Sequence, residues 1–354
     1  MRNLYVFLLL VVANTAFSQS LTSFIDSVRV AKHIPELGYA VVSMDSVLEM
    51  NVLGVKKIGG NMQAAITDKF RIGSNTKTIT SLIAAQLVTE GKLSWETKFF
   101  DLFPELKPSS KSAFLRVSLR DLLSFRTRLF PYTYTDSLPT KNQFSGTEEE
   151  QRYQFTRWFF AQPPVSGRAS FYFSNLNYVA AGLMMEKASG KSYKELVEQL
   201  GRQLNIQFYF GQPNMLADNE PRGHDANSIP EPPGDPYKLN WLLPAGNITM
   251  SLPDMARYAQ EHLKGLHGKS NLLDSSLFNY LHYGEPGYAL GWFWRQEKGD
   301  RLSYHEGNPG TFLARMYLLK KQKKAFIVVC NIQSEIAEEG LEEIVDRMRH
   351  IHNK

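Results

Sequence analysis

Ser74 and Lys77 stand three residues apart at the start of a long apolar segment. On a helix, side chains at this spacing lie on the same face, so both would point in one direction. A serine hydroxyl becomes a useful nucleophile when a base lies within hydrogen-bond reach, and a lysine serves as that base when its pKa is lowered. The pair therefore predicts nucleophilic catalysis by Ser74, although Ser-x-x-Lys is a loose pattern that also occurs at ordinary helix starts.

The position of this pair at a predicted helix start favours the same chemistry. A helix that begins near Gly73 places Ser74 in its first turn, where free backbone N–H groups and the positive end of the helix dipole favour developing negative charge. The apolar pattern continues to Glu90, and Gly91 is the expected C-terminal stop.

The elements around this helix predict an α/β (α+β) fold. An amphipathic helix at 21–34 and two strands at 38–44 and 47–54 precede it. Further helices are predicted at 118 onward, 149–160, 174–190, 192–204 and 251–265. Strands at 288–294, 302–305, 311–319 and 324–331 and a charged helix at 335–349 complete the pattern.

This order indicates an antiparallel sheet flanked by N- and C-terminal helices, with an inserted, mainly helical domain. We expect residues 19–72 and 240–354 to form the α/β domain and residues 73–239 the insertion. The active-site cleft is expected between the two.

The first eighteen residues are typical of a signal peptide. Arg2 gives a short positive region, Leu4 to Val12 form an apolar run, and Ala16-Phe17-Ser18 fits a small-x-small cleavage site. The apolar run is short for a membrane span. We expect an exported protein, periplasmic or secreted, without a stable membrane span after cleavage; an uncleaved anchor is the alternative.

Composition argues against several other functions. The net charge of +5 is mild, and the basic run at 320–324 is expected to be a solvated hairpin turn, which disfavours a nucleic-acid partner. The eight histidines have no zinc-type spacing, so we predict no metal and no cofactor. The single cysteine, Cys330, lies in an apolar strand and is expected to be a core residue. The expected partner is a small-molecule or peptide substrate.

Three stretches resemble, in the same order, the motifs of the serine β-lactamase and penicillin-binding-protein superfamily, and most closely its class C-like branch. Ser74-Asn-Thr-Lys77 is similar to the Ser-x-x-Lys motif, Phe173-Ser-Asn175 to Tyr-Ser-Asn, and His305-Glu-Gly307 to the Lys-Thr-Gly or His-Thr-Gly strand. The runs at 119–123, 244–247 and 254–256 add support. Each motif alone is weak, but the ordered set spans nearly the whole mature chain. The resemblance implies a β-lactamase/transpeptidase-like fold.

The resemblance also implies roles for individual residues. Ser74 attacks a carbonyl group and forms an acyl-enzyme, Lys77 takes or relays its proton, and Asn175 positions Lys77 and the substrate. The backbone N–H groups of Ser74 and Asn308 would form the oxyanion hole. Gly307 would let the substrate backbone approach the strand.

Two departures in the third motif affect the expected substrate. His305 replaces the motif lysine; because histidine titrates near neutral pH, any help in substrate binding should fade as pH rises. Glu306 replaces the usual hydroxyl and, if it faces the cleft, would repel a substrate carboxylate. That favours neutral esters, amides or cationic amines.

The most consequential departure is Phe173, which stands where the family has a tyrosine that acts as base or proton relay. Phenylalanine has no proton to exchange, so Lys77 would have to work alone or with water. Tyr172, presented by a bulge, or Ser174 could substitute as the relay. A third departure, Phe-Arg-Thr-Arg at 125–128 in place of His-Thr-Ser-Gly, is expected to alter loop packing rather than chemistry.

Plainer structural interpretations remain open. Asn175 could be a helix cap, His305 a buried core histidine and Phe173 a core residue. The leading prediction is an exported serine hydrolase that acts by acyl transfer on an ester, an amide or a D-amino-acid peptide, with cell-wall peptides among the candidates. The alternative is a family member impaired by Phe173 that binds a cell-wall peptide or a protein partner.

Overall fold

The computed structural model describes most of the chain after the N-terminal segment. The described residues are 20–133, 136–140, 142–167, 171–215, 219–232 and 241–352. The predicted signal peptide, residues 1–18, lies outside them.

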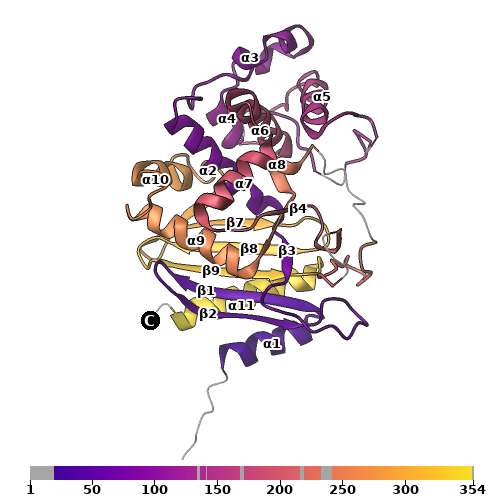
Figure 1. The fold of residues 1–354 in the computed structure, drawn as a ribbon, viewed down its shortest axis with the longest axis vertical. Coiled ribbons are helices and arrows are strands. Elements are labelled where there is room, and N and C mark those ends of the chain that lie inside the picture. Colours follow the sequence, from indigo (N-terminus) through magenta and orange to yellow (C-terminus); the bar gives the residue numbers. More distant parts are fainter. Residues whose placement is uncertain are drawn as a thin grey trace, which may run out of the picture.

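A six-stranded antiparallel sheet forms the lower half of the molecule in Figure 1, with strand order β2-β1-β9-β8-β7-β6. Its strands are β1 (Glu36–Ser43), β2 (Val47–Gly54), β6 (Phe293–Glu297), β7 (Asp300–Gly307), β8 (Leu313–Leu319) and β9 (Lys324–Cys330). The first strand of the chain, β1, therefore pairs with the last one, β9, and β2 lies at the edge of the sheet beside β1. Every residue of β8 is buried, because helices cover both faces of the sheet.

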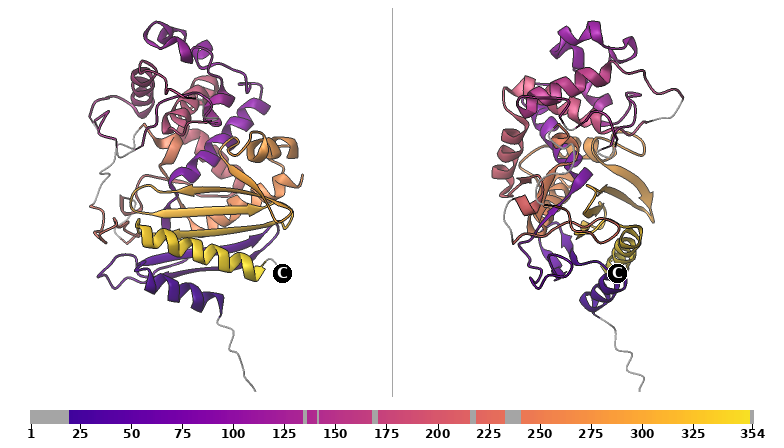
Figure 2. Two further views of the ribbon diagram at one scale, coloured as in Figure 1. Left: turned by 180° about the vertical axis from the view of Figure 1, so that it is seen from behind. Right: turned by 90° about the vertical axis from the view of Figure 1, so that its right-hand side faces the viewer.

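Two layers of helix cover the faces of this sheet. The terminal helices α1 (Leu21–Ala31) and α11 (Glu335–His352) lie together on one face, where a separate hydrophobic cluster seals them to the sheet (Figure 2). On the opposite face, α9 (Leu252–Leu266) packs against β1 and β9, and α10 (Ser275–Tyr283) packs against α9. Cys330 is fully buried, and burial raises its thiol pKa to about 12, which confirms a core role.

The upper half of the molecule in Figure 1 is helical and is built around α2 (Thr76–Thr89). Eleven of its fourteen residues are buried, so α2 is a central helix. The neighbouring elements are α3 (Phe99–Leu102), α4 (Leu119–Leu123), α5 (Glu148–Phe160), α6 (Asn175–Ser189), α7 (Tyr193–Leu204) and α8 (Leu243–Gly246), with short 3₁₀ turns at Pro104–Ser109, Ser112–Phe114 and Pro213–Met215.

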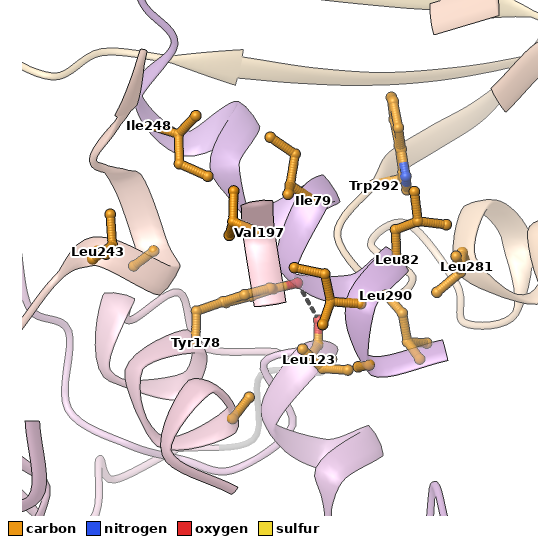
Figure 3. Close-up of a cluster of buried hydrophobic side chains, with 14 of the residues drawn as sticks. Ile79, Leu82, Leu123, Tyr178, Val197, Leu243, Ile248, Leu281, Leu290 and Trp292 are labelled. Atoms are coloured by element: carbon orange, nitrogen blue, oxygen red, sulfur yellow. Dashed lines mark hydrogen bonds between the residues drawn. The ribbon is translucent and has the colours of Figure 1, made fainter. Parts of the chain in front are cut away.

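Figure 3 shows how this core joins α2 to its neighbours. Ile79 and Leu82 of α2 lie among apolar side chains from α4, α6, α7 and the segment that leads into β6. Within it, the hydroxyl of Tyr178 donates a 2.6 Å hydrogen bond to the carbonyl oxygen of Leu123, which ties α6 to the end of α4. The same cluster continues into the sheet, so the division of the chain at residues 73 and 239 stays a prediction.

The sequence predicted most of the long elements to within a few residues, and the short ones less well. A three-stranded sheet of β3 (Lys69–Arg71), β5 (Ile248–Ser251) and β4 (Tyr209–Phe210), together with α10, was not predicted. The strand expected at 288–294 was wrong in its bounds, since β6 runs from Phe293 to Glu297. Gly287 and Gly291 have φ of +73° and +89°, so the chain turns there instead of extending. The basic run at 320–324 does form the turn between β8 and β9.

A buried histidine pair joins α9 and α10 to β7. His262 Nδ1 lies 2.8 Å from His282 Nε2, and His282 Nδ1 lies 2.7 Å from the hydroxyl of Ser303. The ring of His282 stacks on Trp292 at 4.2 Å between centroids. Burial lowers the pKa of His262 to about 3 and that of His282 well below its ordinary value. Both rings are therefore neutral in the folded protein at neutral pH.

This pair should make the protein sensitive to acid. In the unfolded chain both histidines bind a proton below about pH 6.5, whereas the folded state resists it. The stability that they contribute is present above pH 6.5 and is lost as pH falls. In the wild-type protein the unfolding free energy should fall as pH is lowered from about 5.5 to about 4.5. Replacing His262 with phenylalanine should make this slope shallower by about 1.4 kcal/mol per pH unit. Denaturant titrations across this range measure the slope.

His350→Gln is the matched control, because His350 is exposed at the end of α11 and its removal should leave the slope unchanged. An identical slope in the wild-type protein and His262→Phe would show that the pair is not a source of acid sensitivity.

Candidate active site

Ser74 lies in a tight turn that leads into α2. Gly73–Asn75 form a 3₁₀ turn, η1, in which the carbonyl oxygen of Ile72 accepts hydrogen bonds from the backbone N–H and the side-chain amide of Asn75 at 3.1 and 3.0 Å. Gly73 has φ of +51°, and a Cβ atom there would lie 2.9 Å from the backbone nitrogen of Asn308. Only glycine fits this position, and the segment after β7 therefore lies directly against the turn that carries Ser74.

Lys77 is fully buried one helical turn further along, and its ammonium nitrogen has three hydrogen-bond partners. Nζ lies 2.8 Å from Ser74 Oγ, 2.8 Å from Asn175 Oδ1 and 2.7 Å from the carbonyl oxygen of Ala245. These partners come from η1, α6 and α8, so Lys77 joins the three walls of the site.

The side-chain amide of Asn175 has a defined orientation. Its Nδ2 donates to the carbonyl oxygen of Tyr132 at 3.0 Å, which leaves Oδ1 to face Lys77. Asn175 is the first residue of α6, and Ser174 is the N-cap, without a side-chain capping bond. The alternative that Asn175 is only a helix cap is therefore wrong.

Burial lowers the pKa of Lys77 from its ordinary 10.5 to about 7. A neutral amine has two N–H donors and one lone pair. Because Asn175 Oδ1 and the Ala245 carbonyl oxygen can only accept, they take both donors. The lone pair then faces Ser74 Oγ, the one partner that has a proton to give.

An aromatic wall faces the other side of Lys77. The ring centroid of Phe173 lies 5.2 Å from Nζ, and that of Tyr178 lies 5.6 Å away. Phe173 packs on Phe125 at 4.8 Å and also lines the cavity, so it is both a packing residue and part of the site. The segment 125–128 makes packing contacts, as expected: Thr127, for example, donates to Asn177 Oδ1 at 2.7 Å.

Neither residue suggested as a substitute relay reaches the reacting groups. The hydroxyl of Tyr172 lies 3.3 Å from where a Cβ of Gly167 would be, and Tyr172 does not line the cavity. The hydroxyl of Ser174 is buried without a hydrogen-bond partner among the described residues. Lys77 bonds to neither of them. Residues 171–174 belong to no strand or helix, and α6 begins directly after them at Asn175.

His305 is buried on the side of β7 that faces α2, with 1% of its surface exposed. Its Nδ1 lies 2.9 Å from the carbonyl oxygen of Glu306, which can only accept, so Nδ1 carries the proton and Nε2 is a bare lone pair. Burial, and next the charge of Lys77, lower its pKa to about 3. The expectation that His305 titrates near neutral pH is therefore wrong, and the interpretation as a buried histidine fits.

The side chains of Glu306 and Asn308 point toward α11 rather than toward Ser74. Glu306 accepts a short hydrogen bond from the hydroxyl of Tyr317, and Asn308 Nδ2 lies 3.4 Å from an oxygen of Glu338. Both residues nevertheless line the cavity. Glu306 is thus an acidic residue beside the cavity, near the C-terminal end of β7.

A cavity of about 220 Å³ opens beside Ser74. Its lining among the described residues is Gly73, Ser74, Thr133, Phe173, Asn175, Leu242, Ala245, Gly246, Glu306, Asn308 and Pro309. The surface is mainly apolar, and Glu306 is the one charged member of this set. No group of three or more histidine, cysteine, aspartate or glutamate residues within the described ranges is arranged to hold a metal. None of the helices described is long and apolar enough to cross a membrane.

Two buried charged side chains, those of Glu231 and Arg71, form hydrogen bonds that hold the segment after β7. The sequence did not indicate these two braces. The buried carboxylate of Glu231 accepts hydrogen bonds from Thr311 Oγ1 at 2.6 Å and from the backbone N–H of Gly223 at 3.3 Å. Arg71 bridges the Pro309 carbonyl oxygen at 3.4 Å and Asn247 Oδ1 at 3.2 Å. A lone glutamate in a proline-rich loop carries no pattern that could have revealed this role.

Comparison with known proteins agrees with this geometry. The family model described as Beta-lactamase matches residues 21–347. Protein flp of Staphylococcus aureus (strain MW2) is 23% identical over 309 residues, which is 86% of this chain and 61% of that protein. The chain thus spans about three fifths of the length of the curated relatives it matches.

Two solved structures have a similar fold. The octameric penicillin-binding protein homologue from Pyrococcus abyssi superposes with a TM-score of 0.73 at 21% identity, covering 88% of this chain and 73% of that one. The D-amino acid amidase from Ochrobactrum anthropi SV3 superposes with a TM-score of 0.75 at 17% identity, covering 94% and 99%. At these identities the likeness shows a shared β-lactamase/transpeptidase fold.

Proposed function

Because the chain belongs to the Beta-lactamase family, we propose that it is an exported serine hydrolase that works by acyl transfer through Ser74. Its substrate in this proposal is an ester, an amide or a D-amino-acid peptide. The single observation that carries the proposal is the hydrogen bonding of Lys77, whose lone pair faces Ser74 Oγ at 2.8 Å in the neutral form. That arrangement suits removal of the serine proton during attack.

The surroundings of Ser74 also suit the charge that attack creates. When Ser74 Oγ adds to a carbonyl carbon, the carbonyl oxygen becomes negative and needs preorganised donors. The backbone N–H groups of Ser74 and Asn308 are the proposed donors, since Asn308 nitrogen lies against the turn at Gly73. The two braces at Glu231 and Arg71 would hold this pair in place.

The names of the structural neighbours fit an acyl-transfer enzyme without choosing its substrate. One neighbour is a D-amino acid amidase and another is a penicillin-binding protein homologue. In this chain Glu306 is the one acidic residue among the described residues that line the cavity. Neutral or cationic substrates are therefore favoured over those that carry a carboxylate.

Labelling of Ser74 tests the proposal. A fluorophosphonate should add to the mature protein in a 1:1 ratio, and intact-mass spectrometry followed by peptide mapping should place the adduct on Ser74. Ser74→Ala should remove the adduct and lower hydrolysis of an aryl ester about 10³-fold or more. Ser81→Ala in the same helix is the matched control, because its buried hydroxyl does not line the cavity and the variant should label normally. Absence of any adduct on Ser74 would count against catalysis.

A second candidate is a binding protein that has lost turnover. It is favoured by Phe173, whose ring lacks the proton that the family's tyrosine supplies. This candidate predicts an acyl adduct that forms and is not released, or ligand binding without an adduct. Steady release of product over many turnovers would exclude it.

A further inference from the structure

In this site, the proton that Lys77 takes from Ser74 can be returned only to Ser74 Oγ. Once Lys77 has taken the proton of Ser74, its ammonium group has three N–H donors and three acceptors: Asn175 Oδ1, the Ala245 carbonyl oxygen and Ser74 Oγ. Each donor is thus satisfied within the site. The proton that was taken points back at Ser74 Oγ, and not into the cavity where a leaving group would stand.

Among the residues that the structure describes, the other polar side chains around the cavity do not supply an acid. The ring of Phe173 occupies the wall 5.2 Å from Nζ and has no donor. His305 is neutral, and its Nε2 has no proton because Nδ1 holds it against the Glu306 carbonyl oxygen. The hydroxyl of Tyr178 is committed to the Leu123 carbonyl oxygen at 2.6 Å, and burial raises its pKa further.

Apart from Ser74, Thr133 carries the one hydroxyl group among the described residues that line the cavity. This hydroxyl donates a 3.3 Å hydrogen bond to Asp136 Oδ2. The side chain of Glu306 accepts a hydrogen bond from the hydroxyl of Tyr317, on the side of β7 that faces α11. Among the described residues, therefore, each side chain that faces Lys77 or lines the cavity is an acceptor, an apolar surface, or a donor already engaged elsewhere. The backbone N–H groups of Ser74 and Asn308, the proposed oxyanion donors, give hydrogen bonds but are not acids.

From this proton arrangement we infer that the enzyme, if it acts through Ser74 as proposed, cleaves aryl esters and thioesters and not amides. An amide must have its leaving nitrogen protonated as the C–N bond breaks, which requires a general acid at that nitrogen. A phenol or thiol leaves as a stable anion and needs none. The acyl substrate class is thus one whose leaving group is acidic.

The reaction balances without an additional acid. Ser74 Oγ attacks the carbonyl carbon, its proton moves to Lys77, and the bond to the leaving oxygen or sulfur breaks with its electron pair, releasing an anion to solvent. Water then attacks the acyl-enzyme and loses one proton to solvent. Ser74 Oγ, 2.8 Å from Lys77 Nζ, leaves and takes back the lysine proton. Lys77 serves both steps, but only Ser74 is protonated by it.

A series of substituted phenyl esters with one acyl group, and the matching anilide, tests the inference. For the wild-type protein, kcat/KM should fall about tenfold for each unit by which the pKa of the leaving phenol rises, and anilide hydrolysis should be undetectable. Phe173→Tyr should flatten this dependence and raise anilide hydrolysis about 10²-fold or more, because it places a proton donor on the cavity wall. Phe173→Leu, which removes the ring without adding a donor, should keep the steep dependence.

The outcomes separate the inference from the proposed function. Fluorophosphonate labelling of Ser74 together with a flat leaving-group dependence, or with anilide cleavage as fast as ester cleavage, would overturn the leaving-group inference alone. Neither labelling nor hydrolysis of any ester would overturn the proposed function and the inference with it. The wild-type series decides the matter even if Phe173→Tyr does not fold.

Discussion

Replacing Lys77 with methionine is expected to lower kcat/KM for an aryl ester about 10³-fold or more. Methionine keeps much of the apolar stem inside the core but removes the nitrogen that faces Ser74 Oγ at 2.8 Å. The change also leaves Asn175 Oδ1 and the Ala245 carbonyl oxygen without a donor. We therefore expect a loss of stability of about 1–3 kcal/mol, which chemical denaturation would measure.

The pH dependence of the wild-type enzyme gives the sharper test of this role. Catalysis needs the neutral form of Lys77, and burial lowers its pKa to about 7. The acylation rate should therefore rise tenfold per pH unit below pH 7 and level off above it, because the fraction of neutral amine approaches one. An ordinary lysine, with a pKa of 10.5, would still give a rising rate at pH 9.

Lys111→Met is the matched control, since Lys111 is exposed and does not line the cavity. It should keep both the rate and the pH profile of the wild-type protein. If Lys77→Met retains the wild-type rate, or if the wild-type rate still climbs through pH 9, Lys77 is not the base.

The sequence was informative wherever a function depends on side chains at fixed spacing along one element. Ser74 and Lys77 are on one helix face, and the motif order predicted that Asn175 would join them. The third partner of Lys77 is a backbone carbonyl, that of Ala245, and a carbonyl oxygen has no residue type to recognise. The supporting run at 244–247 pointed to the right segment without indicating its role.

The sequence could not predict properties that depend on burial, such as the pKa of a side chain or the direction in which it points. His305 was placed in the third motif correctly, but its pKa of about 3 follows from the side chains that enclose it. The direction of Glu306 depends on the pleat of β7, which turns its carboxylate toward Tyr317 and α11. Short elements such as β3 and β4 were missed because two or three residues give too little periodicity to distinguish them from loops.

Replacing Gly307 with alanine is expected to disrupt the site through the backbone. An added Cβ would lie 2.0 Å from the carbonyl oxygen of Ile72 and 3.0 Å from Asn75 Nδ2. That oxygen is backbone and accepts two hydrogen bonds from Asn75, so it cannot move without pulling on η1. The end of β7 and the turn that carries Ser74 must separate, and the two proposed oxyanion donors separate with them.

A shift of this kind should lower kcat/KM about 10²-fold or more, since displacement of reacting groups by about 1 Å has that effect. Overpacking should also cost about 1–3 kcal/mol of unfolding free energy. Gly340→Ala in α11 is the matched control: its Cβ would lie as close as 2.9 Å to Lys32 Cγ, but a flexible side chain can move aside. Full activity in Gly307→Ala would show that the close approach of β7 to η1 is not needed for catalysis. Loss of activity with unchanged stability would instead place the effect in the oxyanion donors alone, because misalignment of donors lowers the rate without weakening the core.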